Sequence, residues 1–142
     1  SCPVATYTCM NALALAGEPS FAAALTRAAE FFLSRDLIAG ADSKTGCGLF
    51  SDPSGLGYPV MSQYDIISLM RLVAGTPLLN SSRGGELFNF IIRNQNSSGR
   101  WSLSNQGQGM IRESGIESRW VTLNALRMIK AVTEGEAQLE KA

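Results

Sequence analysis

Few side chains in this sequence are of a type and spacing that could do chemistry. The chain of 142 residues carries twelve basic and twelve acidic side chains and has no histidine. Histidine is the commonest general base and a frequent zinc ligand, so Ser–His–Asp, Cys–His and histidine-containing metal sites cannot be built from this chain alone. The aspartates, Asp36, Asp42, Asp52 and Asp65, stand singly. We therefore expect no cofactor and no metal, and we favour a non-catalytic role.

Three cysteines, Cys2, Cys9 and Cys47, are the remaining candidate nucleophiles. Cys2 and Cys9 are two turns apart on one predicted helix, which is too far for a disulfide, and no Cys-x-x-Cys pair exists for zinc. Cys47 lies in a glycine-rich segment, but a nucleophilic thiol needs a base or a lowered pKa, and no histidine can supply it. We expect three reduced, mostly buried thiols.

Hydrophobic periodicity predicts the elements that would have to position any site. Apolar residues recur at helical spacing, and the expected helices span 3–16, 21–35, 62–74, 80 or 81 to 94, and 119–133. Pro3, Ser20 and Ser118 are expected at helix starts and Gly17 at a helix end. The intervening segments are rich in Gly and polar residues and read as loops. No segment shows sustained period-2 alternation, so the predicted class is all-α.

An internal repeat organises these helices. Leu13, Met70 and Leu126 align at offsets of 57 and 56 residues, each within a similar apolar segment. The loops after the second and fourth helices each hold a Gly-x-aromatic motif, which ends at Phe50 and at Trp101. Each unit therefore reads helix, helix, loop, and the last helix begins a third unit.

The repeat resembles a known family. The helical hairpins, the loop aromatic and the closing segment SRWVTLNALR at 118–127 resemble the prenyltransferase and squalene-oxidase repeats, and CPVAT at 2–6 and YDII at 64–67 are similar to bacterial members. Such repeats build the α/α toroid of terpenoid cyclases and protein prenyltransferase β subunits, whose inner helices line a central apolar cavity. The resemblance covers about residues 2–132 and implies a partial α/α toroid of helical hairpins, with about two and a half repeats and five main helices.

The sequence lacks the residues that carry the known chemistries of this fold. Squalene–hopene-type cyclases use an Asp-x-Asp-Asp acid, which single aspartates cannot form. Protein prenyltransferases hold zinc with Asp, Cys and His, and this chain has no histidine. The complement-type thioester domain carries Gly-Cys-Gly-Glu-Gln, whereas here Gly46-Cys47-Gly48 continues with Leu49-Phe50. None of these three reactions is supported.

The repeat register also aligns Tyr7, Tyr64 and Trp120, which are the candidate ligand-binding aromatics. If they lie near the N-termini of inner helices, their rings would surround a concave mouth and could hold an isoprenoid tail or a cation. The alternative is that equivalent aromatics fill equivalent packing gaps. Asp65, in the expected first turn of its helix, is either a helix-start residue or an acid at the cavity rim.

Other conspicuous side chains have structural interpretations. Phe50 and Trp101 are expected to be hydrophobic plugs that pin each loop over its hairpin. Five charged residues near the second long loop are expected to form surface or loop-anchoring ion pairs: Arg100, Arg112, Glu113, Glu117 and Arg119.

These observations predict one repeat domain over 2–133 and a charged C-terminal tail over 134–142, which either frays or extends the last helix. The favoured function is a non-catalytic or cryptic toroid-repeat module that binds an apolar, isoprenoid-like ligand or a protein partner. The alternative is a fragment of a terpenoid cyclase or prenyltransferase-like enzyme whose catalytic residues lie in a partner or in a missing segment. Half a ring leaves apolar helices uncovered, so we expect a homodimer or docking with the rest of a longer chain. Neutral charge predicts no nucleic-acid partner, and short apolar runs predict no membrane span. We also expect a cytoplasmic protein.

Overall fold

The computed structural model describes residues 2–35, 37, 65–102 and 117–139, and the regular elements within these ranges are helices. Five α-helices are present there: α1 (Pro3–Ala16), α2 (Ala22–Leu33), α3 (Ile66–Val73), α4 (Ser82–Arg93) and α5 (Arg119–Leu139). Two short 3₁₀ helices, η1 (Pro19–Phe21) and η3 (Pro77–Asn80), precede α2 and α4. Two isolated antiparallel bridges, one between Gln95 and Trp101 and one between Ser102 and Glu117, lie in and beside the loop after α4. The described residues therefore confirm the all-α class.

Several helix ends lie where the sequence placed them. Pro3 begins α1, and Gly17 ends it with a φ of 68°, a left-handed conformation that glycine adopts without cost. The Ser81 hydroxyl accepts a hydrogen bond of 3.1 Å from the backbone N–H of Gly84 at the start of α4. The Ser118 hydroxyl accepts one of 3.3 Å from the N–H of Val121 at the start of α5. These bonds satisfy amides that have no partner within a helix.

Two helices begin with a different residue from the one expected. Ser20 does not cap α2, because Pro19 starts the η1 turn and α2 begins only at Ala22. α3 begins at Ile66, with Asp65 as its N-cap, rather than at 62. α5 continues through Leu139, so residues 134–139 extend the helix, which is one of the two outcomes expected for the charged tail.

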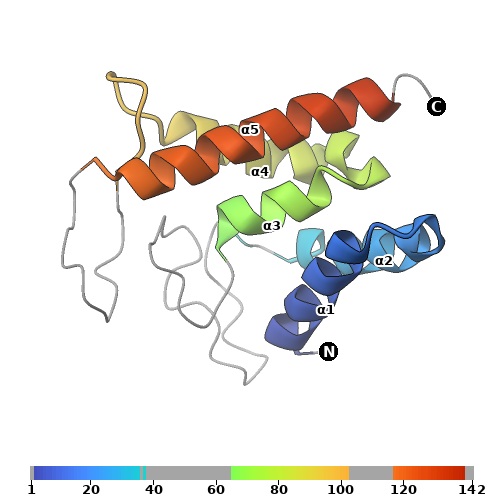
Figure 1. The fold of residues 1–142 in the computed structure, drawn as a ribbon. Helices are drawn as coiled ribbons and strands as arrows, with labels where there is room; N and C mark the ends of the chain where they lie inside the picture. The colour runs from blue at the N-terminus through green and yellow to red at the C-terminus, as the bar shows by residue number, and fades with distance from the viewer. Residues whose placement is uncertain (1, 36, 38–64, 103–116, 140–142) are drawn as a thin grey trace.

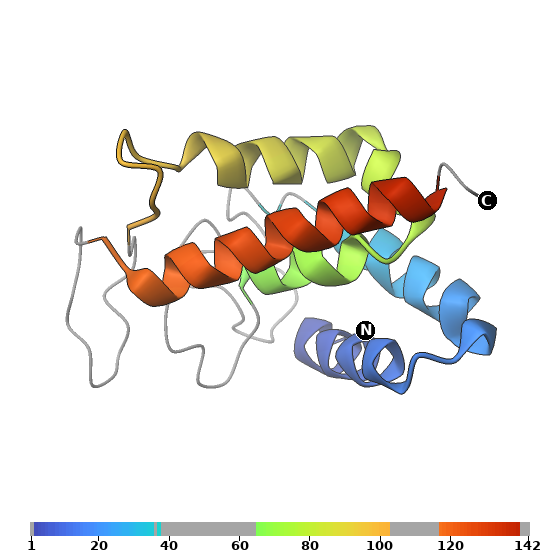
Figure 2. The ribbon, with the colours of Figure 1, turned by 45° about the horizontal axis from the view of Figure 1, so that its top comes forward.

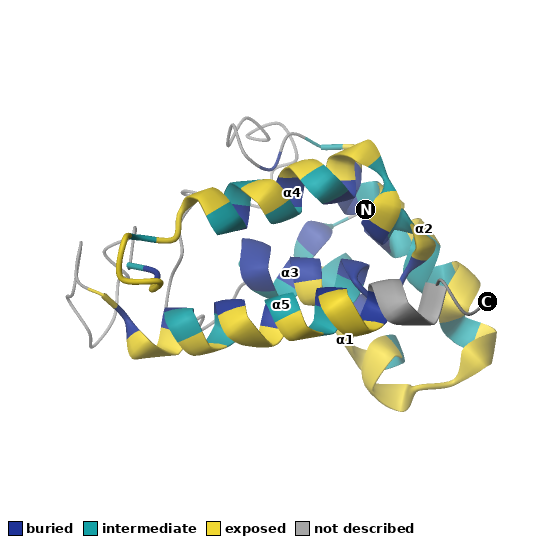
Figure 3. Ribbon diagram, turned by 90° about the horizontal axis from the view of Figure 1, so that it is seen from above, coloured by how far each residue is buried: buried dark blue, intermediate teal, exposed yellow. Residues whose placement is uncertain are grey.

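α3 lies at the centre of the described structure, between α1 and α5 (Figures 1 and 2). It packs against α1, α2, α4 and α5, while α1 also packs on α2, and α5 also packs on η3. α3 is correspondingly apolar around most of its circumference, since Ile66, Ile67, Leu69, Met70 and Val73 are all buried. The neighbouring helices are amphipathic or largely exposed on their outer sides (Figure 3).

Two glycines mark places where a helix approaches another backbone closely. A Cβ atom on Gly84 of α4 would lie 2.5 Å from the carbonyl oxygen of Leu78 and 2.6 Å from that of Leu79. A Cβ atom on Gly135 of α5 would collide with the carbonyl oxygen of Ala74, just after α3. Glycine is a poor helix former, but at position 84 the η3 backbone leaves no room for a larger residue.

Candidate functional site

The carboxylate of Asp65 is used to start α3. Its Oδ1 atom accepts a 2.6 Å hydrogen bond from the backbone N–H of Ser68. In return, the backbone N–H of Asp65 donates a 3.1 Å bond to the Ser68 hydroxyl. This reciprocal pair is a capping box, a device whose N-cap residue is worth about 0.5–2 kcal/mol to a helix. The geometry supports the helix-start interpretation, and a role as an acid at a cavity rim stays a prediction.

The three aligned aromatic residues have different settings. Tyr7 of α1 is half-buried and packs against the hydrophobic core. Trp120, in the first turn of α5, is 52% exposed. Their helices are separated by α3 (Figure 1), and Tyr64 lies outside the described residues. A shared aromatic mouth therefore also stays a prediction.

An apolar stripe runs along α5 from Trp120. Leu123 is 38% exposed and Leu126 is 51% exposed, and the spacing of three residues places them on one side of the helix with Trp120. We call Trp120, Leu123 and Leu126 the α5 stripe. Of these three residues, the sequence indicated only Trp120 as a candidate site residue. The signal for Leu126 was its position in the last aligned helix, which no further repeat follows in this sequence.

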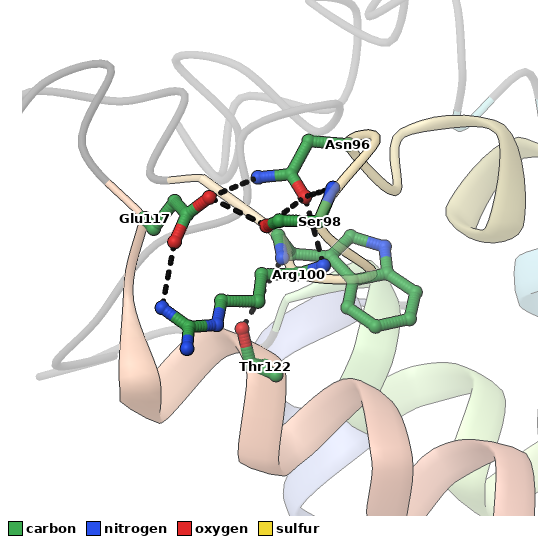
Figure 4. Close-up of polar contacts among 6 residues, drawn as sticks. Asn96, Ser98, Arg100, Glu117 and Thr122 are labelled. Atoms are coloured by element: carbon green, nitrogen blue, oxygen red, sulfur yellow. Dashed lines mark hydrogen bonds and ion pairs between the residues drawn. The ribbon is translucent and has the colours of Figure 1, made fainter.

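A polar cluster joins the loop after α4 to the start of α5 (Figure 4). The carboxylate of Glu117 accepts hydrogen bonds from Asn96 Nδ2 at 3.0 Å, from Ser98 Oγ at 2.6 Å and from Arg100 Nη1 at 2.8 Å. The Asn96 side-chain oxygen also accepts bonds from the backbone N–H groups of Ser98 and Arg100. This cluster holds the loop in a defined turn.

This cluster partly bears out the expected ion pairs. Arg100 and Glu117 form one, whereas Arg112 and Glu113 lie outside the described residues. Sequence analysis missed Asn96 and Ser98, whose Asn-Ser-Ser-Gly segment is typical of a turn stabilised by an asparagine side chain.

Trp101 anchors the same loop to α4 and α5. Its side chain is fully buried, and its Nε1–H donates a 2.8 Å hydrogen bond to the carbonyl oxygen of Ile91 in the last turn of α4. Its backbone N–H donates to the Thr122 hydroxyl of α5 at 3.2 Å, and its carbonyl oxygen accepts from the N–H of Ser118 at 3.0 Å. Trp101 is thus the hydrophobic plug expected from the sequence, while Phe50, its counterpart, lies outside the described residues.

The partners of Glu117 favour the ionised form of its side chain. Hydrogen bonds from Ser98 and Arg100, and the positive charge of Arg100, lower the pKa of Glu117 below its ordinary value of 4.5. A lowered pKa suits a permanent anion that holds a loop, and is the opposite of what a general acid at neutral pH requires.

We expect the loop attachment to weaken only in acid. Because the folded pKa of Glu117 is lowered, its stabilising effect is present above the unfolded pKa and is lost as pH falls through the folded pKa. A carboxyl-carbon NMR titration should give a midpoint below 4.5, and Arg100→Gln should raise that midpoint. Arg83→Gln, which removes the pair with Glu86 on α4, should leave it unchanged. A wild-type midpoint at or above 4.5 would contradict this assignment.

The remaining candidate chemistry is sparse. Cys2 and Cys9 are reduced thiols, but Cys9 is exposed and Cys2 is half-buried, so the expectation of mostly buried thiols is wrong for this pair; Cys47 lies outside the described residues. Across 2–35, 65–102 and 117–139, no cluster of three or more Cys, Asp or Glu side chains is arranged to hold a metal ion. None of the helices in these ranges is both long and apolar enough to cross a bilayer.

Comparisons of the chain with family models, with curated proteins and with solved structures found no match.

Proposed function

We propose that this chain is a non-catalytic module of helical repeats, forming part of an α/α toroid, that binds the apolar surface of a partner. The observation that carries the proposal is the α5 stripe. Trp120, Leu123 and Leu126 expose between 38% and 52% of their surface side by side on one helix. Contiguous apolar surface of this kind is costly to leave in water and is typical of interaction sites.

The helix packing supports the repeat architecture. α1 packs on α2 and α3 packs on α4, as two successive hairpins would. α1, α3 and α5 contact one another in series, which is the arrangement expected of inner helices in a ring of hairpins (Figure 2). In a repeat fold each unit is stabilised mainly by its neighbours, so a terminal helix needs a cap or a partner.

The uses of the acidic residues support a non-catalytic role. Asp65 is engaged in the capping box of α3, and Glu117 is held as an anion by three donors. A stripe along one helix also favours a protein partner over a small isoprenoid-like ligand, because small ligands bind in concave sites that surround most of their surface.

Dye binding tests whether the α5 stripe is an accessible apolar surface. At low protein concentration, anilinonaphthalene sulfonate should show enhanced fluorescence with the wild-type chain. The double variant Leu123→Glu and Leu126→Glu should lose most of this enhancement, because it places two charges in the stripe at positions where glutamate suits a helix. Asn89→Glu, at an exposed position of α4, is the matched control and should bind the dye as the wild type does.

Two outcomes would contradict the proposal. Equal dye binding by the stripe variant and the wild type would show that the α5 stripe is not the apolar binding surface. Turnover of farnesyl diphosphate or squalene, with or without magnesium, would contradict a non-catalytic module and favour the enzyme-fragment alternative.

A further inference from the structure

The exposed apolar side chains lie on the two end helices of a series. Among the described residues, the large hydrophobic side chains that are exposed are Leu15 at 80%, Trp120, Leu123 and Leu126. Leu15 belongs to α1, the other three belong to α5, and α3 lies between these helices. α3, the central helix of the series, has no large exposed hydrophobic side chain. The exposed side chains are therefore found on the two helices at the ends of the series.

The repeat register, read with burial, distinguishes one face that is buried on α1 and α3, which a later helix in the series follows, and exposed on α5. Met10 of α1, Ile67 of α3 and Leu123 of α5 are equivalent in this register. Met10 is 0% exposed and Ile67 is 1% exposed, and both belong to helices that a later helix covers. Leu123 has no such helix beside it among the described residues and is 38% exposed. Met70 and Leu126 repeat the contrast between α3 and α5, with 0% and 51% exposed, and their equivalent in α1, Leu13, is half-buried. We call this the following face.

A second face shows the reverse burial pattern, buried on α3 and α5, which an earlier helix precedes, and exposed on α1. Ala12 of α1, Leu69 of α3 and Ala125 of α5 are equivalent. Leu69 and Ala125 are buried on helices that have an earlier neighbour, whereas Ala12 is exposed on α1, which begins the series. We call this the preceding face. The chain therefore presents an open following face on α5 and an open preceding face on α1.

The two open faces complement each other in size and charge. The preceding face of α1 holds the small exposed residues Ala5, Ala12 and Ala16, with Leu15 beside them. The α5 stripe holds large side chains, and large residues opposite small ones interdigitate well. The sequence of α1 contains no charged residue, so it would bring no like charge to the Arg127 and Lys130 side chains that border the stripe.

We propose that the α5 stripe of one copy of this chain packs on the preceding face of α1 in a second copy, head to tail. This inference rests on the proposed function, because it names the partner of the same stripe. The contact reproduces between chains the α1–α3 and α3–α5 packing already present within one chain. In a twofold dimer the contact occurs twice, since each copy supplies both faces, and neither open face remains in water.

Mass measurement tests the assembly. Light scattering on the full chain should give twice the monomer mass of 15.2 kDa at high concentration. Leu123→Glu with Leu126→Glu should halve the mass, and Ala12→Glu on the other helix should halve it independently. Asn89→Glu should leave the dimer intact. Circular dichroism should show all variants folded, as expected for exposed positions.

Cross-linking tests the head-to-tail geometry without disturbing the stripe by charge. In a background with Cys2, Cys9 and Cys47 changed to serine, Ala12→Cys and Leu126→Cys chains should be joined by a short bismaleimide only when the two are mixed. Cross-linking of the Leu126→Cys chain with itself would show α5-to-α5 pairing and overturn the proposal.

The failure of this inference can be told from the failure of the proposed function. A chain that stays monomeric at every concentration but binds dye at the stripe overturns the second-copy proposal and leaves the stripe as a docking surface for another protein. A dimer whose mass is unchanged by both the stripe and the Ala12 variants overturns the proposed contact. Dye binding that is the same in the stripe variant and in the wild type overturns the proposed function itself.

Discussion

Replacing Trp101 with alanine is expected to lower the free energy of unfolding by about 3–5 kcal/mol, which is the usual cost of truncating a fully buried aromatic residue. Trp101 is 0% exposed, and it joins the C-terminal turn of α4 to the first turn of α5. Single domains are stable by only about 5–15 kcal/mol, so this variant should retain a small margin. Urea denaturation followed by circular dichroism would measure the loss.

Trp101→Phe separates the packing of the indole from its hydrogen bond. The phenyl ring keeps much of the buried apolar volume but cannot donate to Ile91, whose carbonyl oxygen still accepts a 3.2 Å bond from the N–H of Asn94. We therefore expect a loss well below that of the alanine variant, with about 1 kcal/mol from the hydrogen bond. Equal losses in the two variants would mean that ring packing contributes little at this position.

Gly84→Ala is expected to destabilise the protein, although alanine is the better helix former. The added Cβ atom would lie 2.5 Å and 2.6 Å from the carbonyl oxygens of Leu78 and Leu79, which are backbone atoms of η3 and cannot rotate away. Relieving the overlap requires α4 and η3 to move apart, and overpacking of this kind costs about 1–3 kcal/mol or more. Urea denaturation again provides the measurement.

Gly85→Ala is a matched control that should have the opposite effect on stability. A Cβ atom on Gly85 would have no atom within 4 Å outside the backbone of its own helix, so Gly85→Ala should gain helix propensity with no steric cost. We expect it to stabilise the protein by about 0.5–1 kcal/mol. If Gly84→Ala were as stabilising as Gly85→Ala, the close approach of η3 to α4 would be wrong.

Helix ends that depend on neighbouring backbone could be predicted from the sequence. Pro3, Gly17 and Ser118 act on amides and carbonyls within one turn, so their residue types suffice. The choice between a frayed tail and an extended α5 could not be made in this way. The charged segment 134–139 is compatible with both, and Gly135 lets the helix run closely past Ala74, a tertiary contact with no local signature.

The candidate site also contains features that could be predicted from the sequence and features that could not. The capping role of Asp65 and the plug at Trp101 follow from residue type and position in the chain. The part played by Asn96 depends on a turn that brings the loop to Glu117, 21 residues later, which periodicity does not encode. The exposure of Leu123 and Leu126 depends on which helices pack beside α5. The identity of an apolar residue does not show whether a neighbouring helix covers it, so this exposure could not be predicted from the sequence.

The contrasting settings of Trp101 and Trp120 make the chain its own optical reporter. These are its two tryptophans, one buried completely beneath a loop and the other 52% exposed on α5. A small neutral quencher such as acrylamide would reach the indole of Trp120 in the native state and that of Trp101 only when the loop opens. The emission spectrum therefore contains two signals that quenching can separate. Quenching of Trp120 reports whether the α5 surface is covered, and quenching of Trp101 reports local opening of the loop.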